Sequence, residues 1–74
     1  MLVNYDVKVL FAQRLKDLIN EKGISIKRLS EEIGVPDSTI SDWLNFKTTP
    51  IIIHIPKIAL FFKVSTDYLL GLEN

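Results

Sequence analysis

Apolar residues recur at helical spacing through the first third of the chain. From Val7 to Ile19 they fall three or four positions apart, which is the pattern of an amphipathic helix with one buried face. Lys22 then occupies the last turn, where a cation is favoured, and Gly23 can adopt the left-handed conformation that ends a helix. The apolar positions of this first predicted helix are Val7, Leu10, Phe11, Leu15, Leu18 and Ile19.

A second helix is predicted over the segment that begins at Ile26. Ser25 precedes it and can cap it, because a hydroxyl oxygen accepts a hydrogen bond from a free N–H group of the first turn. Leu29 and Ile33 lie four positions apart and define its buried face. Gly34 supplies the left-handed residue at which the helix is expected to end.

A third short helix follows after a turn of only a few residues. Pro36 suits its start, since a first turn does not use the missing N–H, and Asp37 or Ser38 can provide the cap. Ile40 and Trp43 are three positions apart and give this helix a buried face. Two short helices around a tight turn that contains glycine form the outline of a helix-turn-helix.

The remaining segment predicts two more helices. One covers roughly residues 52–63, where Pro56 requires the helix to begin near Ile53 or later. Ser65 or Thr66 is expected to cap the last helix. No β-hairpin turn, repeat or low-complexity run interrupts the series, so the expected fold is all-α with five helices. The side chains expected to point inward from the last two helices are Ile55, Ile58, Ala59, Phe62, Tyr68, Leu69 and Leu72.

Composition limits the chain to a single small domain. A chain of 74 residues buries only about 60% of its unfolded surface, but 47% of these residues are hydrophobic, enough for one core. We take residues 1–7 as an N-terminal arm and residues 8–74 as the domain. Without cysteine, and with His54 as the one histidine, neither a disulfide framework nor a metal site is expected. Neither a secretory signal nor an apolar run of the roughly 20 residues that span a membrane is found, so a cytoplasmic location is expected.

The charge balance offers no strongly basic binding surface. Nine basic and nine acidic residues cancel, and the pI is about 6.5. Proteins that bind nucleic acid usually carry a basic footprint, because phosphate neutralisation supplies most of their non-specific affinity. If the chain binds DNA, a single domain should bind weakly, and two copies per site should help. Within the helix-turn-helix stretch, Lys27, Arg28 and Lys47 stand against Glu31, Glu32, Asp37 and Asp42.

Beyond its first ten residues the chain resembles a known family. The segments FAQRLKDLINEKGIS, LSEEIGVPDSTISDW, KTTP and KIALFFKVSTDYLLG resemble, in order and spacing, the DNA-binding domain of phage lambda-type repressors, Cro-like proteins and XRE-type bacterial regulators. Ser30, Gly34 and Ile40 fill the family's places for a small residue, a turn glycine and an aliphatic residue. The resemblance implies a compact five-helix lambda repressor-like domain with a helix-turn-helix.

The same resemblance implies a cytoplasmic protein of bacterial or phage type that binds double-stranded DNA and is nucleoid-associated when bound. In this family the second helix of the motif, here near residues 37–45, enters the major groove, and its exposed residues meet base edges. The expected base-facing residues are Asp37, Ser38, Ser41 and Asp42, with Thr39 near the DNA backbone. The expected phosphate-contact residues are Ser25, Lys27, Asn45, Lys47 and Thr48.

Several positions depart from the family pattern. Leu44 stands where many members carry a glutamate that pairs with an arginine of the first helix, which leaves Arg14 without that partner. Phe46 stands at a loop position that is commonly glycine, and Ile26 replaces a glutamine that reaches phosphate. Two carboxylates on the expected reading face also bring negative charge towards DNA. Each such charge–charge term is about 1 kcal/mol at ~4 Å in water, a cost that other contacts can outweigh.

A run of apolar residues after the third helix predicts a contact between copies of the chain. Ile51, Ile52 and Ile53 are consecutive, so they cannot all point into a core, and at least one should reach the surface. One reading is a thick core with a single stray isoleucine, and the other is a self-association patch. We expect a homodimer that places two reading helices about 34 Å apart on a palindromic, operator-like site. The expected interface residues are Phe46, Ile51, Ile52, Ile53 and Phe61.

The leading hypothesis is a sequence-specific transcriptional regulator that represses by occluding a promoter. A stand-alone regulator and the DNA-binding part of a longer one both fit the sequence. The alternative is a protein-interaction module, such as an antitoxin, that keeps the helix-turn-helix fold and binds a protein partner with this surface. An enzyme is not expected, since the sequence offers no nucleophile–base pair, paired carboxylates, phosphate-binding glycine loop or metal set, and no cofactor is expected.

Overall fold

Five helices follow one another in the computed structural model, which describes residues 7–73 and contains no strand within that range. The prediction of an all-α fold with five helices is confirmed. Most of the expected N-terminal arm lies outside the described residues, and Val7 is the first residue of α1. No helix within residues 7–73 is long and apolar enough to cross a membrane. The helices are α1 Val7–Lys22, α2 Ile26–Ile33, α3 Asp37–Leu44, α4 His54–Phe62 and α5 Thr66–Leu69.

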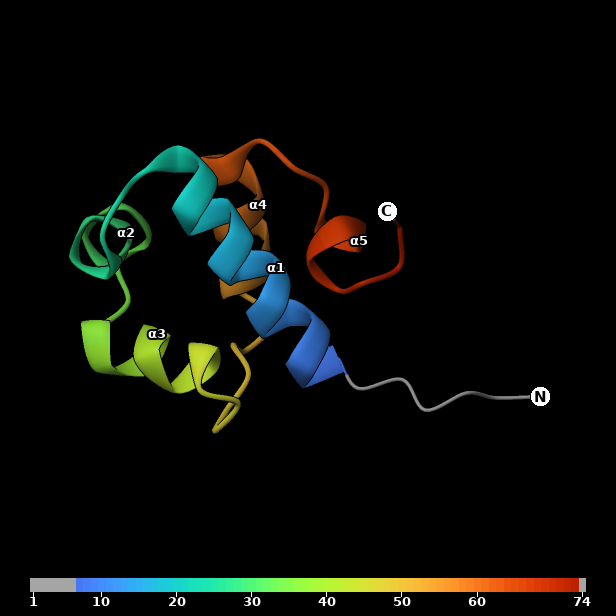
Figure 1. Cartoon of the computed structure of the whole chain (residues 1–74), viewed down its shortest axis with the longest axis horizontal. Coiled ribbons are helices and arrows are strands. Elements are labelled where there is room, and N and C mark those ends of the chain that lie inside the picture. Colours follow the sequence, from blue (N-terminus) through green and yellow to red (C-terminus); the bar gives the residue numbers. More distant parts are fainter. Residues whose placement is uncertain (1–6, 74) are drawn as a thin grey trace.

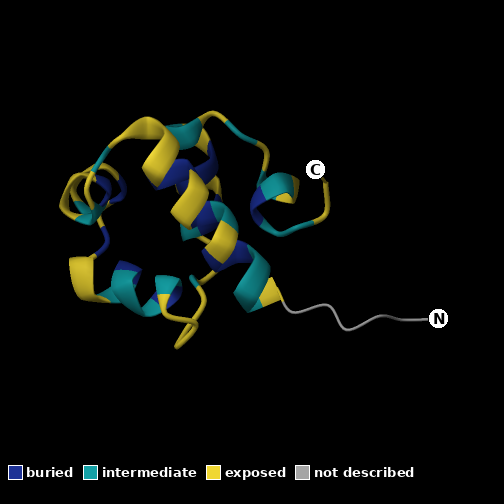
Figure 2. Ribbon diagram, viewed as in Figure 1, coloured by how far each residue is buried: buried dark blue, intermediate teal, exposed yellow. Residues whose placement is uncertain are grey.

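The longest helix, α1, runs through the middle of the domain, and the four short helices surround it (Figure 1). It packs against α3 and α5, while α2 packs against α3 and α4. The inward sides of the helices are buried and their outer sides are exposed (Figure 2). One core therefore joins all five helices. Its buried side chains are Phe11, Leu15, Leu18, Ile19, Leu29, Ile33, Val35, Ile40, Trp43, Ile55, Ile58, Ala59 and Leu69.

Each helix is followed by a residue in the left-handed conformation. The φ angles are 69° at Gly23, 71° at Gly34, 64° at Phe46, 59° at Lys63 and 79° at Gly71. The next N–H group along the chain then bonds back to a carbonyl five positions earlier, as in the Schellman motif. These bonds satisfy carbonyls that a helix end leaves free, so the same device ends all five helices. The bonds are Ile24 N to Ile19 O, Val35 N to Ser30 O, Lys47 N to Asp42 O, Val64 N to Ala59 O and Leu72 N to Asp67 O.

Two serines cap helix starts as the sequence predicts. The Ser25 Oγ accepts a hydrogen bond from the Arg28 N–H at 3.0 Å at the start of α2. The Ser65 Oγ accepts one from the Tyr68 N–H, also at 3.0 Å, at the start of α5. Such a cap contributes about 1 kcal/mol, a large share of the stability of a short helix.

The predicted cap of α3 is wrong. Pro36 itself occupies the position before the helix, with φ −58° and ψ 147°, and no side chain caps it. The helix begins directly at Asp37, so Asp37 and Ser38 lie inside the first turn and cannot precede it. A carboxylate in a first turn is still favoured by the helix dipole.

The side chains predicted to point inward from α4 and α5 are buried only in part. Pro56 is the third residue of α4 and therefore costs no helical hydrogen bond. Leu72, which was expected to point inward, is exposed, because the chain leaves α5 before it reaches this residue. Ile55, Ile58, Ala59 and Leu69 are buried as predicted, whereas Phe62 and Tyr68 are half-buried.

Arg14 has partners other than the one that the family pattern suggests. Its Nη1 donates to the Glu73 carbonyl at 2.9 Å and to the Tyr68 carbonyl at 3.3 Å. Its guanidinium carbon also lies 4.4 Å from the centre of the Tyr68 ring. Arg14 thus lacks the glutamate partner of the family pattern and instead connects α1 to α5 and to the segment after it.

Candidate nucleic-acid interface

The turn between α2 and α3 is built as the sequence predicts. Gly34 takes the left-handed conformation, and its N–H bonds to the Ser30 carbonyl at 2.9 Å. Val35, the next residue, is buried in the core beside the turn. The turn is thus held by both a backbone hydrogen bond and an apolar anchor.

The position of α3 is set by two buried side chains. Ile40 and Trp43 are almost completely buried, and the Trp43 ring meets the Phe11 ring of α1 edge-on at 5.9 Å between centres. An aromatic pair of this geometry contributes about 0.5–1.5 kcal/mol beyond its buried area. These contacts fix the third helix on α1, so its opposite face has one defined orientation. Trp43 is a core residue, as the sequence indicated.

The opposite face of α3 carries the predicted base-facing residues. Ser38 is exposed and Ser41 and Asp42 are half-buried, and helical spacing puts all three on the side away from Ile40. Asn45, a predicted phosphate contact, is exposed just after the helix on the same side. The structure therefore brings the predicted side chains together on one surface. Asp37 is exposed at the start of this helix, and Thr39 and Leu44 lie half-buried at its flanks.

Asn45 is engaged with the helix that it follows. Its Nδ2 donates to the Ser41 carbonyl at 3.0 Å and approaches the Ser41 Oγ at 3.4 Å. The amide hydrogens therefore face Ser41, and the remaining Oδ1 is an acceptor that does not bind a phosphate oxygen. A phosphate contact from Asn45 requires this pair to open.

The cations of the motif lie at its two ends. Lys27 is exposed in the first turn of α2, and Lys47 is exposed in the loop just after α3. Arg28 instead forms an ion pair with Glu32, in which Nε and Oε2 are 2.9 Å apart. The motif therefore has acceptors and hydroxyls on α3 and an exposed lysine near each end of its sequence.

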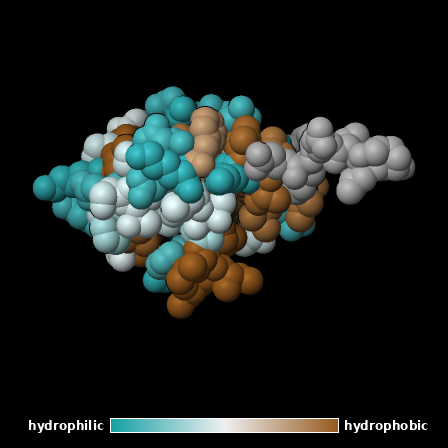
Figure 3. Space-filling model, turned by 90° about the horizontal axis from the view of Figure 1, so that it is seen from below, coloured by the Kyte–Doolittle hydropathy of each residue, from teal (hydrophilic) through white to brown (hydrophobic). Residues whose placement is uncertain are grey.

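The segment after α3 exposes several apolar side chains, and not just one isoleucine. Ile51, Ile52 and Ile53 are all exposed, by 65%, 86% and 57%, and Phe46 is exposed as well. Apolar atoms gather into protruding patches on the face seen from below, beside hydrophilic surface (Figure 3). The reading with a single exposed isoleucine is wrong, because all three isoleucines are exposed, and an exposed apolar cluster is typical of an interaction site.

Two residues of α4 differ from the expected interface pattern. Phe61 is half-buried, with its ring edge-on to Phe62 at 4.9 Å and the Lys22 Nζ at 5.1 Å from its centre. Leu60, which was not predicted, is 78% exposed. Its spacing of seven positions from Ile53 could have shown that both lie on one outward stripe.

The chain matches the HTH_3 helix-turn-helix family over residues 15–69. Curated protein sequences gave no significant match. The restriction-modification controller protein C.AhdI from Aeromonas hydrophila is a similar solved structure, with a TM-score of 0.77 and 26% identity over 84% of this chain and 94% of that one. A transcriptional regulator from Listeria innocua has a TM-score of 0.79 and 28% identity over 86% of this chain, which spans 60% of the regulator.

The same fold occurs in a hypothetical transcription factor, NHTF, from Neisseria. Its TM-score is 0.81 at 19% identity, and the match covers 95% of this chain and 85% of that chain. At this identity the likeness shows the fold alone. The fold of this chain is therefore shared with a protein of largely different sequence.

Proposed function

We propose that this chain, which belongs to the HTH_3 helix-turn-helix family of DNA-binding transcription regulators, is a repressor. In this proposal it binds operator DNA as a homodimer. The observation that carries this proposal is the polar outward face of α3, with Ser38, Ser41 and Asp42, held in place by the burial of Ile40 and Trp43 on the other side. A helix fixed in this way can enter the major groove without rearrangement.

The chemistry of this outward face suits base reading by acceptors and hydroxyls. The Asp42 carboxylate can accept a hydrogen bond from cytosine N4, and the hydroxyls of Ser38 and Ser41 can pair with several bases. Asp37 at the helix start adds a second acceptor, and Thr39 lies beside the DNA backbone. A carboxylate close to any DNA phosphate is disfavoured by like-charge repulsion, so Asp37 and Asp42 contribute favourably only where they face base edges.

Phosphate binding rests on few groups. Lys27 and Lys47 are the exposed cations at the ends of the motif, and Thr48 and the hydroxyl hydrogen of Ser25 can donate to phosphate oxygens. Two lysines per protomer, in two protomers, give about four neutralised phosphates. The logarithm of the binding constant should then fall with the logarithm of salt concentration with a slope of about −4.

A homodimer offsets this weak electrostatic attraction. The proposed interface contains the exposed side chains Phe46, Ile51, Ile52 and Ile53, with Phe61 at its edge. A two-fold contact through this surface would set two α3 helices about 34 Å apart, one turn of DNA. Such a dimer covers a promoter and excludes the polymerase, which is the mode of repression that we propose.

Selection of genomic DNA fragments by the purified protein tests this proposal. We expect an enriched palindromic sequence, bound with a salt dependence near the slope given above. If no sequence is enriched and the affinity for DNA does not change with salt, the protein-interaction module is the better function. In that case the acidic α3 surface would serve a protein partner.

A matched pair of variants locates the reading face. Asp42→Asn removes a carboxylate from the outward face of α3, and Asp17→Asn removes one from the exposed side of α1. We expect Asp42→Asn to relax the preference at one base pair of the selected site, a loss of about 1–3 kcal/mol of discrimination. Asp17→Asn should leave the preference unchanged. Equal behaviour of the two variants would place base reading elsewhere.

A further inference from the structure

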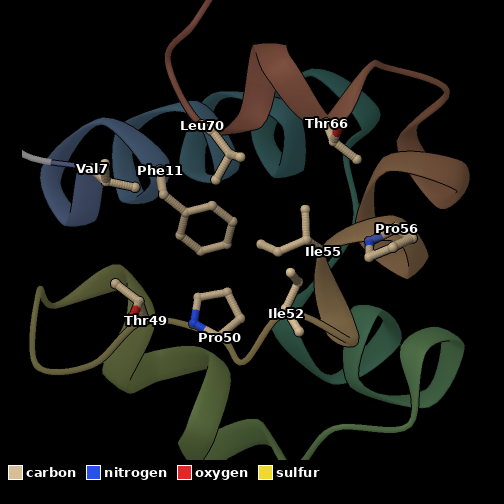
Figure 4. Close-up of a pocket in the computed structure, with 9 residues that line it drawn as sticks. All are labelled: Val7, Phe11, Thr49, Pro50, Ile52, Ile55, Pro56, Thr66 and Leu70. Carbon is tan, nitrogen blue, oxygen red and sulfur yellow. The ribbon is translucent and has the colours of Figure 1, made fainter.

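A pocket of about 550 Å³ lies beside the start of α1, and the segment after α3 forms part of its wall. Figure 4 shows the side chains of Phe11, Ile55 and Leu70 directed into one central space, with Thr49 and Pro50 of that segment at its edge. The only polar side chains in the wall are the hydroxyls of two threonines, so a base or a phosphate placed there would leave most of its hydrogen-bonding groups unpaired. Base reading therefore falls to the outward face of α3 and to the residue that follows this helix.

The Asn45 side chain has a defined orientation at the end of α3. Its Nδ2 lies 3.0 Å from the Ser41 carbonyl oxygen and 3.4 Å from the Ser41 Oγ. A carbonyl oxygen can only accept hydrogen bonds, so the NH2 group must face it, and an amide turned the other way would set two acceptors against each other. The Asn45 Oδ1 is therefore the atom directed away from Ser41, and Asn45 is exposed.

The Ser41 hydroxyl still has a hydrogen to donate. In the contact with Asn45 its Oγ is the acceptor. Within residues 7–73 no acceptor takes the hydroxyl hydrogen. Ser41 is only half-buried, so this hydrogen can reach a bound molecule. The two residues lie four positions apart, on the same side of the helix, and together they offer one donor beside one acceptor.

Adenine is the base whose own major-groove edge matches this pattern. It presents the N7 acceptor beside the N6 amino donor, whereas guanine presents two acceptors, cytosine one donor and thymine one acceptor. A free asparagine reads adenine with both atoms of its amide. Here the amide hydrogens face Ser41, so the Ser41 hydroxyl supplies the donor in their place.

We propose that Ser41 and Asn45 read one adenine as a pair, and that Asn45 determines specificity instead of binding a phosphate. The Ser41 hydroxyl donates to N7, and the Asn45 Oδ1 accepts from the N6 amino group. This inference rests on the proposed function, because it assigns one base to the α3 surface that meets the operator. It adds an adenine to the cytosine that the Asp42 carboxylate can read.

Binding to the site that the wild-type protein selects tests the pair. Each A·T pair of that site is replaced in turn by G·C, and the affinities of wild type, Asn45→Ala and Ser41→Ala are compared. We expect both variants to lose about tenfold of the preference at the same A·T pair of each half-site. Asn20→Ala, at an exposed asparagine of α1, should leave every preference unchanged.

A modified base tests the assignment of the atoms. The analogue 7-deazaadenine has a C–H group in place of N7 but keeps the N6 amino group and normal base pairing. At the adenine identified above, it should weaken the wild-type protein and Asn45→Ala by about fivefold. It should not weaken Ser41→Ala further, because that variant has already lost the donor.

Three results would overturn the inference and leave the proposed function intact. Uniform weakening of all sequences by Asn45→Ala, with every base preference retained, would make Asn45 a phosphate contact. Changes at different base pairs in the two variants would show that they do not act as a pair, and changes at a G·C pair would exclude adenine. Failure of the wild-type protein to select any sequence would instead overturn the proposed function, and this inference with it.

Discussion

Phe46 adopts a backbone conformation that suits glycine. Its φ is 64°, and the Lys47 N–H that follows it bonds to the Asp42 carbonyl at 2.9 Å to close the end of α3. A side chain in this region costs about 1–2 kcal/mol. The phenylalanine ring is also exposed, so burial in the monomer does not offset that cost. A contact with a second copy of the chain, as proposed above, would bury the ring and offset this cost.

Replacement of this residue separates the two effects. Phe46→Gly should raise the free energy of unfolding of the monomer by up to about 1 kcal/mol, since the relieved strain exceeds the entropy cost of glycine. The same variant should weaken dimer formation. Lys63→Gly, at φ 59°, is the control that relieves strain without touching the proposed interface. Urea titration of dilute protein and sedimentation measure the two quantities, and a less stable Phe46→Gly monomer would contradict the strain argument.

At the scale of elements, α5 shows how a very short helix is held. It has four residues, Thr66–Leu69, far fewer than an isolated helix needs. Three kinds of contact stabilise it. They are the Ser65 cap, the complete burial of Leu69 and the hydrogen bonds from Arg14. Its existence therefore depends on contacts with α1 more than on its own sequence.

Loss of the Arg14 contacts should destabilise this part of the domain. Arg14→Met keeps the length of the side chain but removes the hydrogen bonds to the two carbonyls and the contact with the Tyr68 ring. We expect a loss of about 1–2 kcal/mol in urea unfolding. Lys16→Met, on the exposed side of the same helix, should change the stability by less than about 0.5 kcal/mol. Equal effects of the two substitutions would show that Arg14 does not hold α5.

At the scale of the whole molecule, zero net charge and an exposed apolar surface act together. The chain has nine basic and nine acidic residues, so no long-range repulsion keeps copies apart. The isoleucines after α3 lie in the segment that connects the candidate reading helix to α4. If two copies associate through these isoleucines, the geometry of the contact sets the distance between their two α3 helices.

A pair of equally exposed side chains tests this association. Ile51 and Leu72 are exposed by 65% and 63%, but only Ile51 belongs to the proposed interface. Ile51→Ser should weaken the dimer about tenfold or more, which corresponds to ~1.4 kcal/mol, and leave monomer unfolding unchanged. Leu72→Ser should leave the dimer constant unchanged. Sedimentation across a concentration series gives the constants, and monomer alone at every concentration would rule out the homodimer.

Local sequence features determined most of the secondary structure and the outline of the site. Helix periodicity placed Leu29, Ile33, Ile40 and Trp43 in the core, and this in turn assigned the opposite face of α3 to solvent. The serine cap of α2 was likewise predictable. These features act over a few residues through hydrogen bonds and side-chain spacing, so a single sequence contains them.

The tertiary structure decided the features that join distant segments. The partners of Arg14 lie more than fifty positions away, and the pocket beside Val7 is lined by residues from both ends of the domain. The exposure of Leu60 depends on which side of α4 the other helices cover. The start of α3 at Asp37 depends on the extended backbone conformation of Pro36 after the turn. No local pattern contains these outcomes, because they follow from the packing of whole helices around one core.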